Sequence, residues 1–218
     1  MYNSTAASGE YLTKKKTIVE NLNIDTVKDT PFPNNGLKNI LLMDDQFFPI
    51  LTLRRVFHTL SVLHNQPERK QEIVTKAMVS GRDVEALTFA IDNFRQENFN
   101  IFEYTDDRCG FEVIASLRNP DSGPIHLAIL DIILGAGLLD TKTNELISVD
   151  GIDVAVKLRE KYSNINIMFN SGCVLGLSKE SYKLQQVEEK IAPYSYSDKP
   201  FDNDLWLIDA AVAVSNIL

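Results

Sequence analysis

Two short apolar runs that each end in aspartate constrain most strongly what this chain can fold into. Residues 40–43 are Ile-Leu-Leu-Met and lead into Asp44 and Asp45, and the run 126–130 leads into Asp131. Continuous apolar runs of this kind are typical of strands buried on both faces, as in a parallel sheet covered by helices. We therefore expect an α/β fold with aspartates at the ends of two strands.

Segments with helical periodicity alternate with short strands along the rest of the chain, which indicates β-α units. Further strands are predicted at 100–104, 165–170 and 194–196. Helices are predicted after Pro49, at 111–117, after Gly151, at 178–191 and at the C-terminal end, with two more within 64–98 that Gly81 separates.

The domain boundaries follow from changes in composition. Residues 1–36 are polar and contain Pro31 and Pro33, so they are predicted to form a tail or linker. One domain is expected over 37–218, with a helical insertion at about 64–98 and a long polar loop at about 135–150.

Charge and cysteine content exclude several classes of protein. A net charge of −8 argues against a nucleic-acid-binding surface, which needs clustered basic residues. The chain contains no apolar run long enough to span a membrane. Its two cysteines, Cys109 and Cys173, are too few for a disulfide framework, so a cytoplasmic location is expected.

Polar residues at the carboxyl ends of the predicted strands indicate one shared site, because ligands of open parallel sheets bind at that edge. Asp44, Asp45 and Asp131 are joined there by Ser171 after the fourth strand and Lys199 after the fifth. Clustered carboxylates repel one another unless a cation lies among them, and Mg²⁺ prefers such oxygen ligands. Phosphoryl transfer to Asp131 as nucleophile, with Mg²⁺, Lys199 and Ser171 neutralising charge, is the chemistry that this set predicts.

The same features make the chain resemble a known family. An acidic pair after strand one, a single aspartate after strand three, Ser-Gly after strand four and Lys-Pro-Phe after strand five are similar to those of response-regulator receiver domains, the CheY-like domains of two-component phosphorelays. The resemblance covers residues 37–218. It implies a flavodoxin-like, doubly wound, five-stranded parallel sheet with strand order 2-1-3-4-5.

The resemblance also implies a role for each acid. Asp44 and Asp45 correspond to the metal-binding acids, and Asp131 corresponds to the phosphoacceptor. Ile133, two residues after the acceptor, corresponds to the position whose backbone carbonyl binds the metal. Mg²⁺ is the cofactor that this implies.

Three further residues correspond to the parts of the family that sense phosphorylation. Ser171 takes the place of the switch hydroxyl, Tyr196 that of the switch aromatic residue, and Lys199 that of the phosphate-binding lysine. The bond between Lys199 and Pro200 is expected to be cis, as in the family.

The function that the resemblance implies is a phosphorylation-driven switch. A histidine kinase or phosphotransfer protein would donate the phosphoryl group, and a downstream protein would read the face formed by the fourth helix, the fifth strand and the fifth helix. Such a domain assists its own phosphorylation and dephosphorylation and is not an enzyme acting on other substrates.

Departures from the family pattern keep two alternatives open. The interval from Asp45 to Asp131 is unusually long because of the insertion, so the chain is alternatively a receiver-like binding module that acts through its inserted helices without phosphorylation. A phosphohydrolase with an aspartate nucleophile usually carries a second aspartate two residues after it, where this chain has Ile133.

Overall fold

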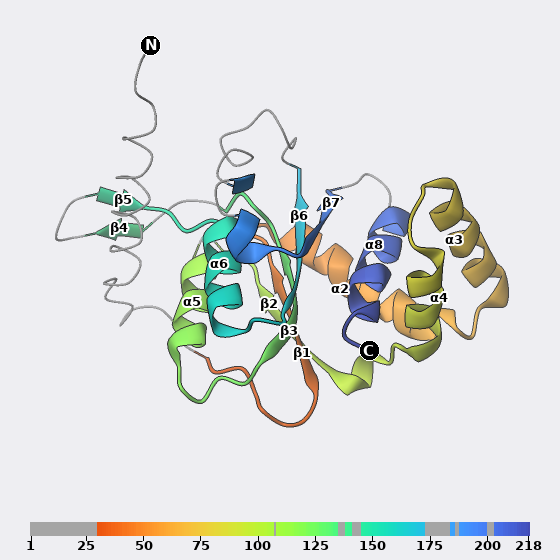
Figure 1. The fold of residues 1–218 in the computed structure, drawn as a ribbon, viewed down its shortest axis with the longest axis horizontal. Helices are drawn as coiled ribbons and strands as arrows, with labels where there is room; N and C mark the ends of the chain where they lie inside the picture. The colour runs from red at the N-terminus through yellow and green to blue at the C-terminus, as the bar shows by residue number, and fades with distance from the viewer. Residues whose placement is uncertain are drawn as a thin grey trace, which may run out of the picture.

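A five-stranded parallel sheet forms the centre of the molecule in the computed structural model, which describes residues 30–106, 108–134, 138–140, 145–172, 184–185, 188–199 and 203–218. Its strands are β1 (Lys38–Met43), β2 (Phe99–Tyr104), β3 (Ile125–Leu130), β6 (Asn166–Ser171) and β7 (Tyr194–Asp198). The spatial order is β2-β1-β3-β6-β7, with every neighbouring pair parallel (Figure 1). This order confirms the predicted doubly wound, flavodoxin-like sheet.

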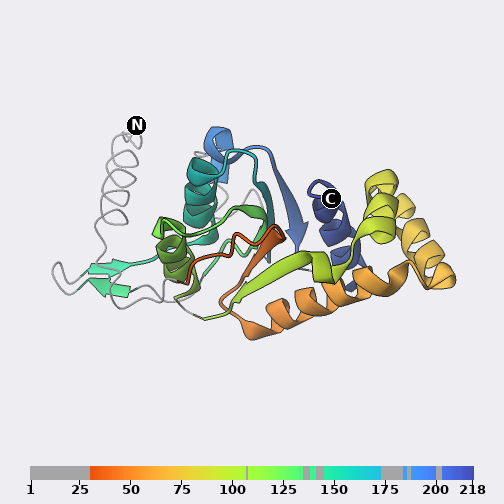
Figure 2. The ribbon, with the colours of Figure 1, turned by 90° about the horizontal axis from the view of Figure 1, so that it is seen from below.

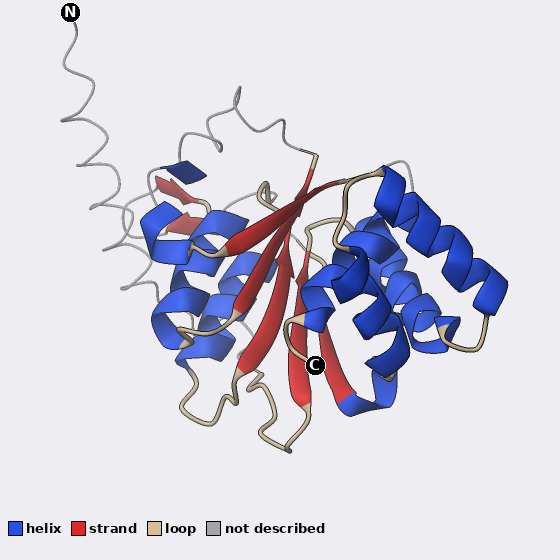
Figure 3. Ribbon diagram, turned by 45° about the vertical axis from the view of Figure 1, so that its right-hand side comes forward, coloured by secondary structure: helices blue, strands red, loops and turns tan. Residues whose placement is uncertain are grey.

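Helices cover both faces of the sheet (Figure 3). On one face lie α5 (Cys109–Arg118) and α6 (Gly151–Lys161), and on the other lie α2 (Phe47–Leu63) and α8 (Asn203–Ser215). Successive side chains of a strand point to opposite faces. In β1, Leu41 and Met43 join the core beneath α5 and α6, whereas Ile40 and Leu42 join the core beneath α2 and α8. Burial on both faces explains the continuous apolar run.

The insertion forms two helices, as predicted, followed by a short 3-10 turn. These are α3 (Pro67–Val79), α4 (Val84–Asn93) and η1 (Gln96–Asn98), and Gly81 turns the chain between the helices with a φ of 69°. Figure 2 shows α3 and α4 on the side of α8 that faces away from the sheet. Their buried side chains belong to the same core as α2 and α8; these are Ile73, Ala77, Leu87, Ala90 and Ile91.

Ion pairs also join the insertion to α8. Arg69 and Lys76 of α3 both contact Asp204, and Nε of Arg82 lies 3.2 Å from Oδ1 of Asp209. The inserted helices are therefore fixed on the core and cover part of the last helix.

Two stretches differ from the predicted boundaries. Phe32 is buried against Phe102 and Tyr104, so the packed domain includes part of the predicted tail 1–36. A single phenylalanine among prolines and polar residues gives no periodicity by which to recognise it. Within the predicted loop 135–150, β4 (Leu138–Asp140) and β5 (Glu145–Ile147) pair as an antiparallel hairpin. Two apolar pairs flank a polar stretch of sequence there, and their shortness concealed the strands.

Two further predictions concern helical segments. Residues 184–185 and 188–191 are helical, and the rest of the predicted helix 178–191 lies outside the described residues. Among the described residues, no helix combines the length and the apolar character that crossing a membrane requires.

Candidate functional site

Three carboxylates converge at the carboxyl edge of the sheet, as the sequence predicted. Asp44 and Asp45 follow β1, and Asp131 follows β3. The amide of Asp131 donates to the carbonyl of Met43 over 2.8 Å, and that of Asp44 donates to the carbonyl of Tyr104 over 3.1 Å. Because the sheet hydrogen bonding continues one residue beyond these strands, it fixes the backbone of both acids. One oxygen from each of the three carboxylates lies within 4.8 Å of the others.

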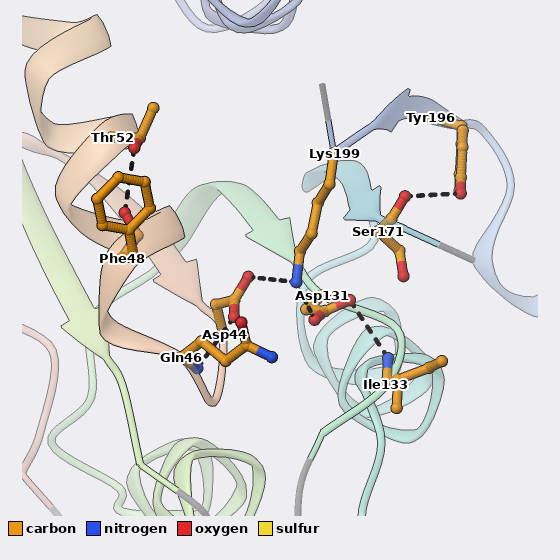
Figure 4. Close-up of polar contacts among 9 residues, drawn as sticks. All are labelled: Asp44, Gln46, Phe48, Thr52, Asp131, Ile133, Ser171, Tyr196 and Lys199. Atoms are coloured by element: carbon orange, nitrogen blue, oxygen red, sulfur yellow. Dashed lines mark hydrogen bonds and ion pairs between the residues drawn. The ribbon is translucent and has the colours of Figure 1, made fainter. Parts of the chain in front are cut away.

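Lys199 reaches into this cluster from the end of β7 (Figure 4). Its Nζ donates to Oδ2 of Asp131 and lies 2.8 Å from Oδ2 of Asp44. Asp44 is 2% exposed and Asp131 is 4% exposed, so both carboxylates are almost sealed from water. In the part of the chain that the structure describes, the ammonium of Lys199 contacts two of the three carboxylates, those of Asp44 and Asp131.

Burial and neighbouring charges both shift the pKa values of Asp44 and Lys199. Burial raises the pKa of Asp44 to about 6; the contact with Lys199 lowers it, and repulsion from Asp131 raises it. Burial lowers the pKa of Lys199, but its contacts with Asp131 and Asp44 raise that pKa by more, so the ammonium is held charged. Three clustered carboxylates supply hard oxygen ligands, which fit a divalent cation such as Mg²⁺.

Replacing Lys199 tests whether its ammonium is the counter-charge of Asp44 and Asp131. In Lys199→Met we expect the metal-free protein to lose about 2 kcal/mol of unfolding free energy at neutral pH, because two buried carboxylates lose their counter-charge. Saturating Mg²⁺ should recover most of the loss, as measured by urea unfolding with and without the ion. As a control, Lys157→Met removes an ammonium that pairs with Glu160 at the surface, and its effect should stay within about 0.5 kcal/mol. Equal losses in the two variants, or no recovery with Mg²⁺, would contradict a counter-ion role.

The backbone around Asp131 is tightly packed. The amide of Ile133 donates to Oδ1 of Asp131 over 3.3 Å, and the side chain of Ile133 is exposed. Gly151, the first residue of α6, donates its amide to the carbonyl of Ile132 over 3.1 Å. A Cβ at Gly151 would collide with the carbonyl oxygen of Asp131. Sequence reasoning recognised Gly151 only as a helix start, although glycine, a poor helix former, directly after the acidic N-cap Asp150 was a signal of close packing.

The backbone carbonyl of Ser171 joins this residue to Tyr196 and to Lys199, and Figure 4 shows the contact with Tyr196. The carbonyl of Ser171 accepts the amide of Lys199 over 3.1 Å and the hydroxyl of Tyr196 over 3.0 Å. A displacement of Ser171 would therefore act on both residues. The predicted cis bond lies outside the described residues, since Pro200 is not among them.

Comparisons with known proteins return matches among solved structures alone. Searches of protein-family models and of curated proteins give no match. A receiver domain protein from Methanospirillum hungatei JF-1 is 15% identical with a TM-score of 0.43, covering 82% of this chain and 96% of that chain. A receiver protein from Sinorhizobium medicae WSM419 is 17% identical with a TM-score of 0.41, covering 82% and 97%. A chain of the CheX-CheY-BeF3-Mg+2 complex from Borrelia burgdorferi is 17% identical with a TM-score of 0.43, covering 91% and 96%.

Proposed function

We propose that this chain is a phosphoacceptor receiver of a two-component phosphorelay, phosphorylated on Asp131 in a Mg²⁺-dependent reaction. The observation that carries the proposal is the convergence of three carboxylates with Lys199 at the edge of the sheet. Asp44, Asp45 and Asp131 would hold the ion, with the backbone carbonyl of Ile133 as a further ligand. When bound, Mg²⁺ would offset the charge of the carboxylates and of the phosphoryl oxygens.

The residues of the chain supply the rest of the transfer. A carboxylate oxygen of Asp131 attacks the phosphorus of a phosphohistidine on a histidine kinase or phosphotransfer protein, forming an O–P bond as the P–N bond breaks. The departing imidazole of the donor takes up a proton from solvent. Lys199 already contacts Asp131, so its ammonium lies close enough to pair with a phosphoryl oxygen on that residue.

The shared carbonyl of Ser171 supplies a route from phosphorylation to the surface. If the hydroxyl of Ser171 moves toward the phosphoryl group, its carbonyl moves with it, and the hydrogen bond from Tyr196 must change. A downstream protein would read that change on the face formed by β7 and α8. Because α3 and α4 cover part of α8, the surface available to such a partner includes the insertion.

Incubation with acetyl phosphate tests the proposal against the two alternatives. We expect the wild-type chain to gain the mass of one phosphoryl group when Mg²⁺ is present and to gain none when the ion is chelated. The absence of an adduct in both samples would favour a binding module that acts through α3 and α4. Steady turnover of a small phosphomonoester would favour the phosphohydrolase.

The pKa of Asp44 leads to a pH dependence of metal binding. Because that pKa is raised from 3.8 to about 6, Mg²⁺ must displace a proton from Asp44 at lower pH. We expect the Mg²⁺ affinity from titration calorimetry to fall up to about tenfold per pH unit below pH 6 and to level off above it. The stability of the metal-free fold depends on pH in the opposite direction. Asp44 binds its proton more tightly in the native state than in the unfolded state, so its contribution to the free energy of unfolding declines as pH rises from about 4 to 6. An affinity that does not change across this window would contradict a role for Asp44 as a ligand.

A further inference from the structure

Asn170 is a buried amide beside the site for which the proposed chemistry has no use. It is the residue before Ser171 in β6 and is 2% exposed. In the part of the chain that the structure describes, neither its Oδ1 nor its Nδ2 has a hydrogen-bond partner. Burying an unpaired amide destabilises a fold, and native proteins seldom do so without a reason.

The register of the sheet places Asn170 beside Asp131. Phe169 of β6 pairs with Leu130 of β3, and both belong to the core beneath α5 and α6. The next residues on the two strands, Asn170 and Asp131, therefore face the opposite side, toward α2 and α8. Neighbouring strands lie about 4.8 Å apart, so the side chain of Asn170 lies next to Asp131 on the same face of the sheet.

On the other side of Asn170 in the sheet lies Ser197, which is bound to α8 and not to Asn170 through its hydroxyl. Asn170 pairs with Ser197 of β7, whose hydroxyl donates to Oδ2 of Asp209 over 2.7 Å. The amide thus lies between a serine that α8 holds and the predicted phosphoacceptor.

A second buried asparagine shows what a structural role looks like in this fold. Asn39, at the other end of β1, is 0% exposed. Its Nδ2 donates to the carbonyls of Pro33 and Pro124 over 2.9 and 2.8 Å, and its Oδ1 accepts from Nδ2 of Asn100 over 2.8 Å. Asn39 joins three segments through hydrogen bonds, whereas the amide of Asn170 bonds to none of the described residues.

We propose that Asn170 is a positioning residue whose Nδ2 donates to the carboxyl oxygen of Asp131 that does not carry the phosphoryl group. This inference rests on the proposed function. In the unphosphorylated fold, Lys199 and the amide of Ile133 hold the two oxygens of Asp131. With the phosphoryl group on Oδ1, Oδ2 loses its bond from Lys199 when the lysine turns to the phosphoryl group. A carbonyl oxygen has two lone pairs, so Oδ2 can bind the ion and still accept from Asn170, the buried amide next to it.

The substitution Asn170→Leu, of similar size, separates this role from a structural one. The ratio of the rate constant for phosphorylation by acetyl phosphate to that for loss of the phosphoryl group should fall about tenfold, the value of one hydrogen bond in the phosphorylated state. The melting temperature of the metal-free protein should not fall, since no bond is lost there. The control Asn39→Leu should lower the melting temperature by about 5–10 °C and leave the ratio unchanged.

A measurement on the wild-type chain keeps the test independent of folding of the variants. In ¹⁵N NMR spectra, the side-chain amide signals of Asn170 should shift when beryllofluoride and Mg²⁺ are added, while those of Asn39 should not. The inference is overturned if the Asn170 signals stay in place, or if Asn170→Leu loses stability as Asn39→Leu does and keeps the wild-type ratio. Failure of the wild-type chain to form any adduct would instead overturn the proposed function.

Discussion

Asp131→Asn is expected to abolish the adduct that acetyl phosphate forms with the wild-type chain. A carboxamide is a much weaker nucleophile than a carboxylate, and Asp131 is one of the two acids that Lys199 contacts. Removing one of three clustered negative charges relieves repulsion at the site, so the variant should fold. Intact mass measured over a time course should show no phosphoryl group while the wild type approaches one per chain.

The control for this variant is the same substitution at an acid outside the cluster. Asp121 is exposed in the turn before β3, so Asp121→Asn should be phosphorylated at the wild-type rate. Retention of the adduct in Asp131→Asn would move the acceptor to another residue. Peptide mapping of the wild-type adduct would then identify that residue, with Asp44 and Asp45 the first to be examined.

The main strands and the convergence of their acids followed from the sequence because both depend on local patterns. A run such as 40–43 is apolar at every position only when both faces of the strand are covered, and parallel strands bring their carboxyl ends to one edge. Asp44 and Asp131 were therefore predictable neighbours. Their metal-binding and acceptor roles stay predictions.

What the sequence did not reveal depends on contacts between distant segments. The apolar stripe of α3 predicted a helix, but only the fold shows that this stripe meets α8 and that Arg82 reaches Asp209. Asn170 looked like an ordinary residue at a strand end, because its significance lies in the hydrogen-bond partners that it lacks among the described residues. The burial of Phe32 was not predicted because a single apolar residue forms no periodic pattern in the sequence.

Gly151→Ala is expected to damage both the fold and the acceptor. A Cβ at this position would overlap the carbonyl oxygen of Asp131 and would lie 3.2 Å from Cα of Ile132. Both are backbone atoms, so relief requires α6 or the acceptor segment itself to move. We expect a loss of about 3 kcal/mol of unfolding free energy in urea unfolding, at the upper end of overpacking effects. Because the movement displaces Asp131, phosphorylation by acetyl phosphate should slow at least about tenfold.

Helix propensity alone predicts that Gly151→Ala would raise the stability of the fold rather than lower it. Alanine is favoured over glycine inside a helix by about 1 kcal/mol, so an unobstructed substitution there would be neutral or stabilising. Gly172 supplies the comparison, because a Cβ there meets no heavy atom within 4 Å, and Gly172→Ala should change stability by less than about 0.5 kcal/mol. If Gly151→Ala matched the wild type in both measurements, α6 would not pack on the acceptor segment. The expected loss would instead show that the first residue of α6 packs directly on the backbone of Asp131 and leaves no space for a methyl group.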